Sequence, residues 1–172
     1  VVWSVSRRGA LDRCKGTVGQ KLLATSNNGA ITRAASGVTV TGTTGMNAGN
    51  DTITLTEAAN NFQGAVALTT TTTNTNDVAI INSVSINLGA SSVAVDLNIT
   101  TITGNIADSG NLDAGGNSVF TAAGGSSIIL DSAGSDVAGT IECARIGSAA
   151  VAYVSILASS ALVVNAMTVV GL

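Results

Sequence analysis

The chain has 172 residues, of which 45% are hydrophobic and 10% charged, and it contains 20 glycines but no proline and no histidine. Its formal net charge of −3 argues against a nucleic-acid-binding protein, which needs a basic surface. Without histidine, Ser-His and Cys-His catalytic pairs and histidine metal sites are excluded. Aromatic residues make up only 2%. A core of small β-branched residues suits layers that stack in the same way many times.

Short stretches that alternate polar and apolar β-branched residues predict β-strands. The clearest stretches are, in chain order, 38–41, 52–56, 84–88 and 93–97. Groups rich in Gly, Asn and Asp predict the turns between strands, because these residues accept a positive φ at little cost. Such groups occupy 27–29, 47–51, 113–117 and 124–126. No helical period competes over a useful length, so the chain is predicted to be all-β.

The polar positions of the first two strands form a candidate outward ladder for a ligand. They are occupied by Thr39, Thr41, Thr52, Thr54 and Thr56. A flat Thr-rich or Asn-rich surface could bind a glycan or ice. Ice binding requires Thr in register on every coil, however, and the five-threonine run 69–73 is matched by 144–148, Ala-Arg-Ile-Gly-Ser, in the second repeat. This mismatch argues against ice.

An internal repeat of 75 residues, the interval from Ile53 to Ile128, organises the chain. Segment 31–66 aligns with 106–141, and 22–25 aligns with 97–100. The predicted organisation is a single segment over 1–172, divided into a partial repeat 1–17, a repeat 18–92, a repeat 93–168 and the start of another at 169–172. The chain is therefore expected to be an excerpt from a longer array.

The repeat favours a β-solenoid over a β-sandwich, because a sandwich does not need its second half to resemble its first. A coil of three short strands takes roughly 19–25 residues, so one repeat should hold about three or four coils. Inward positions should form ladders of Val, Ile and Leu, and outward positions ladders of Thr, Ser and Asn.

The runs 50–55, 58–66 and 104–112 resemble repeats of giant bacterial surface exoproteins of the filamentous-haemagglutinin-like type. These proteins leave the cell by two-partner or autotransporter routes. The resemblance covers most of the chain, from about Ala10 onward, and implies a right-handed parallel β-helix located outside the cell. No secretion domain and no outer-membrane barrel is recognisable in the sequence.

Carboxylates are the residues most able to support catalysis, because polysaccharide-cleaving β-helices use paired carboxylates as acid and base. The candidate pairs are Asp108 with Asp113, and Asp131 with Asp136. Neither pair recurs as a unit in the alignment, so solvated turn residues are the preferred interpretation. No cysteine cluster for zinc and no nine-residue calcium repeat is present. We therefore expect no enzyme activity, no metal and no cofactor.

Three further features have structural interpretations. Cys14 and Cys143 should lie many layers apart and form no mutual disulfide, with Cys143 acting as a small core residue. A basic cluster, consisting of Arg7, Arg8, Arg13, Lys15 and Lys21, should be a solvated edge of one layer, with a local patch for an anionic surface polymer as the alternative. The uncharged stretch 146–172 is interrupted by serines and Asn165 and has a repeat partner, which favours strands over a membrane span.

The expected function is structural: the shaft of an extracellular adhesin, or a subunit of a self-stacking filament. The expected partners are other copies or neighbouring segments of the same long chain, and surface glycans. A glycan- or ice-binding module using the outward ladder is the alternative.

Overall fold

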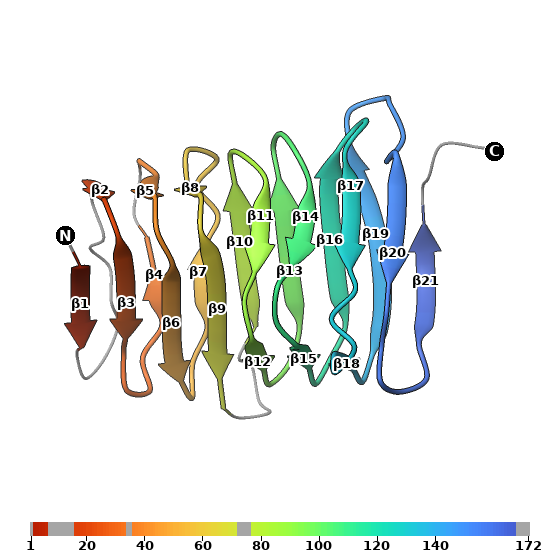
Figure 1. Ribbon diagram of the computed structural model, residues 1–172. Helices are drawn as coiled ribbons and strands as arrows, with labels where there is room; N and C mark the ends of the chain where they lie inside the picture. The colour runs from red at the N-terminus through yellow and green to blue at the C-terminus, as the bar shows by residue number, and fades with distance from the viewer. Residues whose placement is uncertain (1, 7–15, 34–35, 72–76, 168–172) are drawn as a thin grey trace.

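A computed structural model of the chain describes residues 2–6, 16–33, 36–71 and 77–167. These residues form a β-solenoid, in which short strands wind repeatedly around one core and successive turns stack side by side (Figure 1). Every strand pairing is parallel, and no helix occurs among the described residues. The predicted all-β solenoid is therefore confirmed.

Three sheets share the 21 strands. Sheet A has eleven strands: β1 (Val2–Ser6), β3 (Lys21–Thr25), β6 (Thr44–Gly49), β9 (Ala65–Thr70), β11 (Ile86–Leu88), β12 (Ser91–Val93), β14 (Ile106–Asp108), β15 (Leu112–Ala114), β17 (Ser127–Leu130), β18 (Asp136–Val137) and β20 (Tyr153–Ile156). Sheet B has seven: β4 (Ile31–Thr32), β7 (Ile53–Leu55), β10 (Val78–Asn82), β13 (Leu97–Thr101), β16 (Ser118–Ala123), β19 (Thr140–Ile146) and β21 (Val163–Met167). Sheet C has three: β2 (Gly16–Val18), β5 (Val38–Val40) and β8 (Asn61–Phe62).

Each turn of the solenoid takes about the number of residues that the sequence predicts. The shortest step in the register joins Val78 to Leu97, and the longest joins Ile128 to Val154. These steps span 19 and 26 residues. Since sheet B contributes one strand per turn, its seven strands correspond to seven turns.

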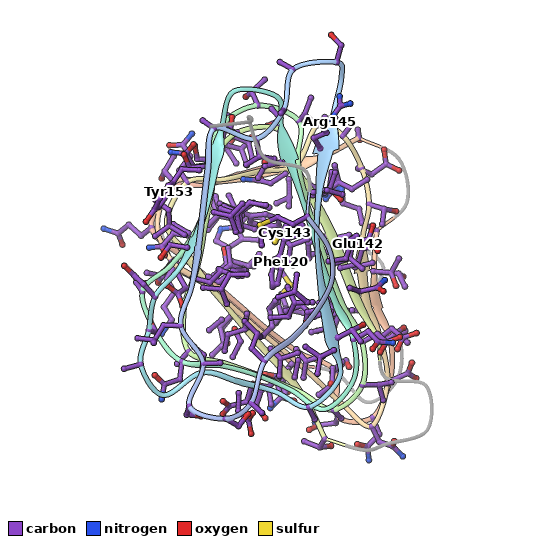
Figure 2. All side chains as sticks on the ribbon, turned by 90° about the vertical axis from the view of Figure 1, so that its right-hand side faces the viewer. Phe120, Glu142, Cys143, Arg145 and Tyr153 are labelled. Carbon is purple, nitrogen blue, oxygen red and sulfur yellow. The ribbon has the colours of Figure 1, made fainter. Side chains whose placement is uncertain are left out.

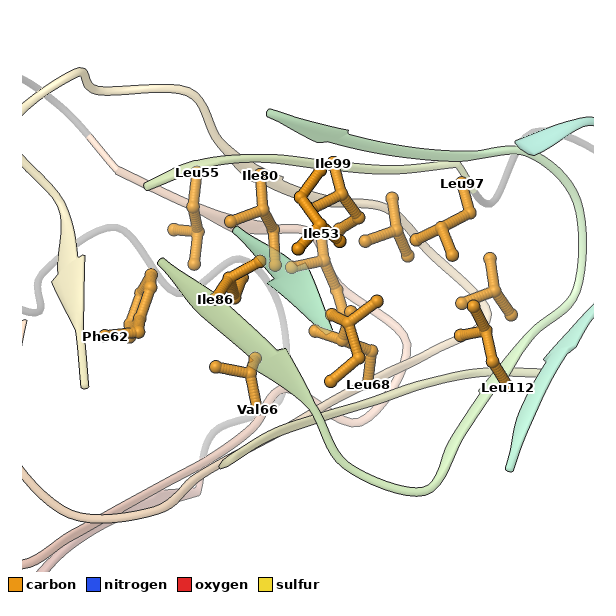
Figure 3. Packing of buried hydrophobic residues seen from close by; sticks show 14 of the residues in the cluster. Ile53, Leu55, Phe62, Val66, Leu68, Ile80, Ile86, Leu97, Ile99 and Leu112 are labelled. Atoms are coloured by element: carbon orange, nitrogen blue, oxygen red, sulfur yellow. The ribbon is translucent and has the colours of Figure 1, made fainter. Parts of the chain in front are cut away.

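The core is a continuous stack of aliphatic side chains between sheets A and B. Strands alternate buried and partly exposed residues: in β10, Val78, Ile80 and Asn82 are buried, and the two residues between them are partly exposed. Figure 3 shows Ile53, Leu55, Ile80 and Ile99 layered in this way, and Figure 2 shows side chains gathered inside the wound chain, with Phe120 and Cys143 among them. Phe62 and Phe120 are fully buried. Aliphatic residues stack on aliphatic residues of other types, as Ile53, Val78 and Leu97 do, so the core is filled with few aromatic side chains.

The 75-residue repeat spans three and a half turns, so each repeat begins on the opposite face from the one before. Leu22, Thr44, Val66 and Leu88 are successive partners in sheet A, which makes three turns. The repeat partner of β3, however, is β13, which lies half a turn later in sheet B. The sequence predicts three or four coils per repeat, and the structure has three and a half. Two repeats restore the original face after seven turns.

Because of the half-turn offset, the side of the solenoid that carries one long strand per turn changes along the axis. In the first turns sheet A has single long strands, whereas the other wall is divided between sheets B and C. From β11 onward sheet A is divided, as into β11 with β12, and sheet B has the long strands. The three strands of sheet C correspond by sequence to β12, β15 and β18.

Asn82 ends sheet C by replacing a strand. Its Oδ1 accepts a hydrogen bond from the Phe62 amide at 2.8 Å, and its Nδ2 donates to the Phe62 carbonyl at 3.1 Å. These are the two backbone groups that a next strand of sheet C would have paired. Nδ2 also donates to the carbonyls of Val84 and Ser85. The fully buried side chain is therefore completely satisfied.

Several sequence predictions concern the ends of the chain. The described part of 146–172 forms the end of β19 together with β20 and β21, and no helix of the described residues is long and apolar enough to cross a membrane. Lys21 is exposed, and Cys143 is a buried free thiol. The other four residues of the basic cluster, and Cys14, lie outside the described residues, in the range 7–15.

Candidate functional site

The five threonines of the predicted ladder are all at least partly exposed, but they do not form one ladder. Thr39 lies in β5 of sheet C, where it stacks between Thr17 and Asn61. Thr54 lies in β7 of sheet B, between Thr32 and Ala79. Thr41, Thr52 and Thr56 lie at the ends of these two strands. The five residues thus belong to two sheets.

The structure instead brings together a polar file along the outer surface of sheet A. Consecutive register partners place one residue from each successive turn in this file: Ser6, Thr25, Asn47, Thr69, Ser92, Asp113 and Asp136. The Ser160 hydroxyl donates to Asp136 Oδ1 and extends the file by one position. Neighbouring parallel strands lie about 4.8 Å apart, so the file is a straight row of polar groups at that spacing.

A groove of about 520 Å³ lies along the C-terminal half of the polar file. Ser92, Asp113 and Asp136 line it, and Gly115 and Gly134 form part of its wall. Both carboxylates are exposed and stand directly opposite each other on β15 and β18. Because small residues line the groove, the carboxylates are accessible from its open side.

A second file of mostly small residues runs beside the first four members of the polar file, two positions earlier on each strand. It consists of Ser4, Leu23, Gly45 and Ala67. In the first turns, the outer surface of sheet A therefore combines a hydrogen-bonding row with a row of low relief. Hydroxyl groups donate and accept, and carboxylates accept, so this surface suits a ligand that carries many hydroxyls.

The candidate carboxylates do not meet in the sequence-based pairing of Asp108 with Asp113. Asp108 does not face Asp113; its Oδ1 accepts from the Asp131 amide at 3.0 Å and its Oδ2 from the Ser132 amide at 3.3 Å. Asp108 is thus a structural side chain that binds the backbone of the next turn. Asp113 and Asp136 meet instead, since they are one turn apart, and this spacing would have revealed the pair once the coil length was known.

The same structural use of turn side chains recurs elsewhere. Asp96 Oδ1 accepts from the Asn117 amide at 2.7 Å, and Asn117 Oδ1 accepts from the Thr140 amide at 3.0 Å. Asn105 Oδ1 accepts from the Ser127 amide at 2.9 Å. Among the described residues no group of three or more His, Cys, Asp or Glu could hold a metal ion. The turn carboxylates and amides therefore mainly join one turn to the next.

Cys143 is the nucleophile with the most altered chemistry. Burial, with a smaller contribution from the charge of Glu142, raises the pKa of the thiol from its ordinary value near 9 to about 11. Figure 2 shows Cys143 in the core beside Phe120, with Glu142 on the outer side of the same wall. A thiol held neutral among apolar side chains is inert, which agrees with its predicted role as a core residue.

Comparison with known proteins finds a match to the repeats of the chain. A family model described as "Repeats of unknown function (DUF5649)" matches residues 3–69 and again 75–144, at a spacing close to that of the repeat described above. No curated protein and no solved structure matches the chain. Since the two matches together cover most of the sequence, the chain belongs to the family of repeats of unknown function DUF5649.

Proposed function

We propose that this chain is a structural segment of an extracellular β-solenoid, serving as the shaft of a filamentous-haemagglutinin-like surface adhesin or as a subunit of a self-stacking filament. The observation that carries the proposal is the seven-turn period. Because two repeats return the chain to its starting face, copies of the two-repeat unit can follow one another along a straight axis without a change of direction.

The chemistry of the solenoid supports a mechanical role. One hydrophobic core runs through all turns, and side chains of turn residues bind the backbone of the adjacent turn on its outside. In a quasi-one-dimensional fold of this kind, stability is the sum of many similar contacts between neighbouring turns. Such a rod bears load along its length and holds whatever is attached to its end away from the surface.

Assembly of the purified chain tests the proposal. Negative-stain electron microscopy and sedimentation velocity over a range of concentrations should show rods that lengthen as concentration rises. Fibre diffraction should give a meridional reflection at about 4.8 Å, the spacing of stacked strands. Dispersed particles of constant size at every concentration would exclude the self-stacking filament and leave only the shaft.

The polar file of sheet A supports a second candidate function, the binding of a surface glycan. Its groove offers two carboxylates and the hydroxyl of Ser92 among small lining residues such as Gly115 and Gly134, so a sugar chain could approach the sheet closely. The file mixes Ser, Thr, Asn and Asp rather than repeating Thr, which favours a glycan over ice as the ligand.

A glycan array tests this candidate, with two variants as controls. Asp113→Asn together with Asp136→Asn removes both charges from the groove and should weaken binding of any retained glycan. Asn98→Ala alters an exposed side chain on sheet B and should leave binding unchanged. If no glycan binds, or if the two variants weaken binding equally, the polar file is not a glycan site.

A further inference from the structure

The strands at the C-terminal end of the solenoid cover the core but are not themselves covered by described residues. β20 pairs only with β17, and β21 pairs only with β19. Tyr153 is 55% exposed and Val163 is 56% exposed. Val154 and Ile156 pack on the core and remain half-buried, whereas their partners one turn earlier, in β17, are buried. This end presents a parallel strand edge with apolar side chains.

At the opposite end of sheet A the edge strand is β1, which pairs with β3 (Figure 1). Trp3 stands beside Leu22 and Val5 beside Ala24, so both residues occupy inward positions of the sheet. Trp3 nevertheless remains 41% exposed. Val5 packs only partly against the core. Among the residues that the structure describes, β1 therefore pairs on one side only, with β3.

The repeat makes β1, β10 and β20 equivalent strands. Their inward apolar residues are Trp3 with Val5, Val78 with Ile80, and Val154 with Ile156. In sheet B the next strand after β10 is β13, and the repeat partner of β13 is β3. β3 and β13 therefore both fit the free edge of β20, but β13 is enclosed inside the solenoid between β10 and β16, so β3 is the one near an end. In its own chain, β3 is covered by β1.

We propose that two copies of this chain join by strand exchange, with β20 of one copy replacing β1 of the next copy on β3. The proposal rests on the self-stacking function proposed above and specifies its contact. Because two repeats span seven turns, the second copy continues sheet A on sheet A and sheet B on sheet B. The exchanged pair repeats a pairing already present twice, in β1 with β3 and in β10 with β13.

The exchange fixes a register between the copies. Val154 would stand beside Leu22, and Ile156 beside Ala24, as Trp3 and Val5 do within one chain. Ser155 would then stand beside Leu23, and both of these side chains point outward. Simple end-to-end addition, in which β1 stays in place, would instead set Ser155 beside Ser4. Outward neighbours on adjacent strands lie within the Cα–Cα range of a disulfide, about 4.4–6.8 Å.

Cysteine cross-linking distinguishes these two contacts. The variants Ser155→Cys with Leu23→Cys, and Ser155→Cys with Ser4→Cys, are made in a background that carries Cys14→Ser and Cys143→Ser. Each is oxidised and analysed on non-reducing gels, with the three single variants as controls. Exchange predicts covalent dimers and longer ladders for the Leu23 pair, at a yield several-fold above the Ser4 pair and the single variants.

Trp3 supplies a second readout that needs no substitution, because it is the only tryptophan in the chain. Strand exchange releases Trp3 into solvent, so its fluorescence should move to longer wavelength as copies assemble. End-to-end addition would bury Trp3 and move the emission to shorter wavelength. A ladder from the Ser4 pair with a shift to shorter wavelength overturns the exchange but keeps self-stacking. The absence of both ladders, with only monomers in sedimentation, overturns the self-stacking function as well.

Discussion

Asn82 substitutes for a strand at the end of sheet C, and its replacement by alanine tests whether one side chain can do this. Asn82→Ala removes four hydrogen bonds and leaves the amide and the carbonyl of Phe62 without their partners in a site that is fully buried. Each orphaned backbone group costs about 1–2 kcal/mol, so the local unfolding free energy should fall by about 3 kcal/mol.

Hydrogen exchange followed by NMR or mass spectrometry measures this effect where it occurs. A solenoid can open locally, so the Phe62 amide should lose about a hundredfold of its protection, since about 1.4 kcal/mol corresponds to a factor of ten. Urea denaturation followed by circular dichroism should show a lower midpoint. The matched control, Asn98→Ala, changes an exposed asparagine three strands further along the chain, in β13, and should stay within about 0.5 kcal/mol of the parent.

The reasoning fails if the Phe62 amide of Asn82→Ala exchanges at the parent rate. That outcome would mean that water or a shifted strand satisfies Phe62 equally well. A loss of protection spread over all seven turns, and equal in Asn98→Ala, would also contradict a local role.

Three further predictions address backbone contacts, a buried thiol and the polar file. Gly42→Ala should lower the unfolding free energy by about 3 kcal/mol or more, because a Cβ there would lie 1.3 Å from the carbonyl oxygen of the previous turn. Gly125→Ala, where φ is +81° and the space is open, should cost only about 1 kcal/mol, and equal losses in urea denaturation would refute the crowding argument. Since burial raises the pKa of Cys143 to about 11, the folded chain keeps its thiol protonated above pH 9, where the unfolded chain loses that proton. Stability should therefore be retained below pH 9 and fall between pH 9 and 11; Cys143→Ala should flatten this part of the profile, and an unchanged slope would count against the assignment. Asp113→Asn should raise the thermal midpoint slightly, by a gain of about 0.5 kcal/mol, because it removes the like charge opposite Asp136, and a lower midpoint would show that the pair is stabilising.

The sequence by itself determined the solenoid. Alternating residues such as those of 38–41 fix strands whose two sides differ, and the 75-residue period requires that the second half build the same layers as the first. The inward ladders follow directly, because apolar side chains at every second position must share one core. The placement of Cys143 in that core followed from the same alternation.

The tertiary structure decided on which face of the solenoid each repeat begins. A period in sequence carries no information about the angle through which the chain has turned, and so the half-integer number of turns per repeat could not be predicted. The angle depends on the summed lengths of the turns, which vary from the step between Val78 and Leu97 to that between Ile128 and Val154. The length of a single coil, which the repeat also leaves open, places Asp136 beside Asp113 in the polar file, whereas Asp108 binds the backbone of the next turn.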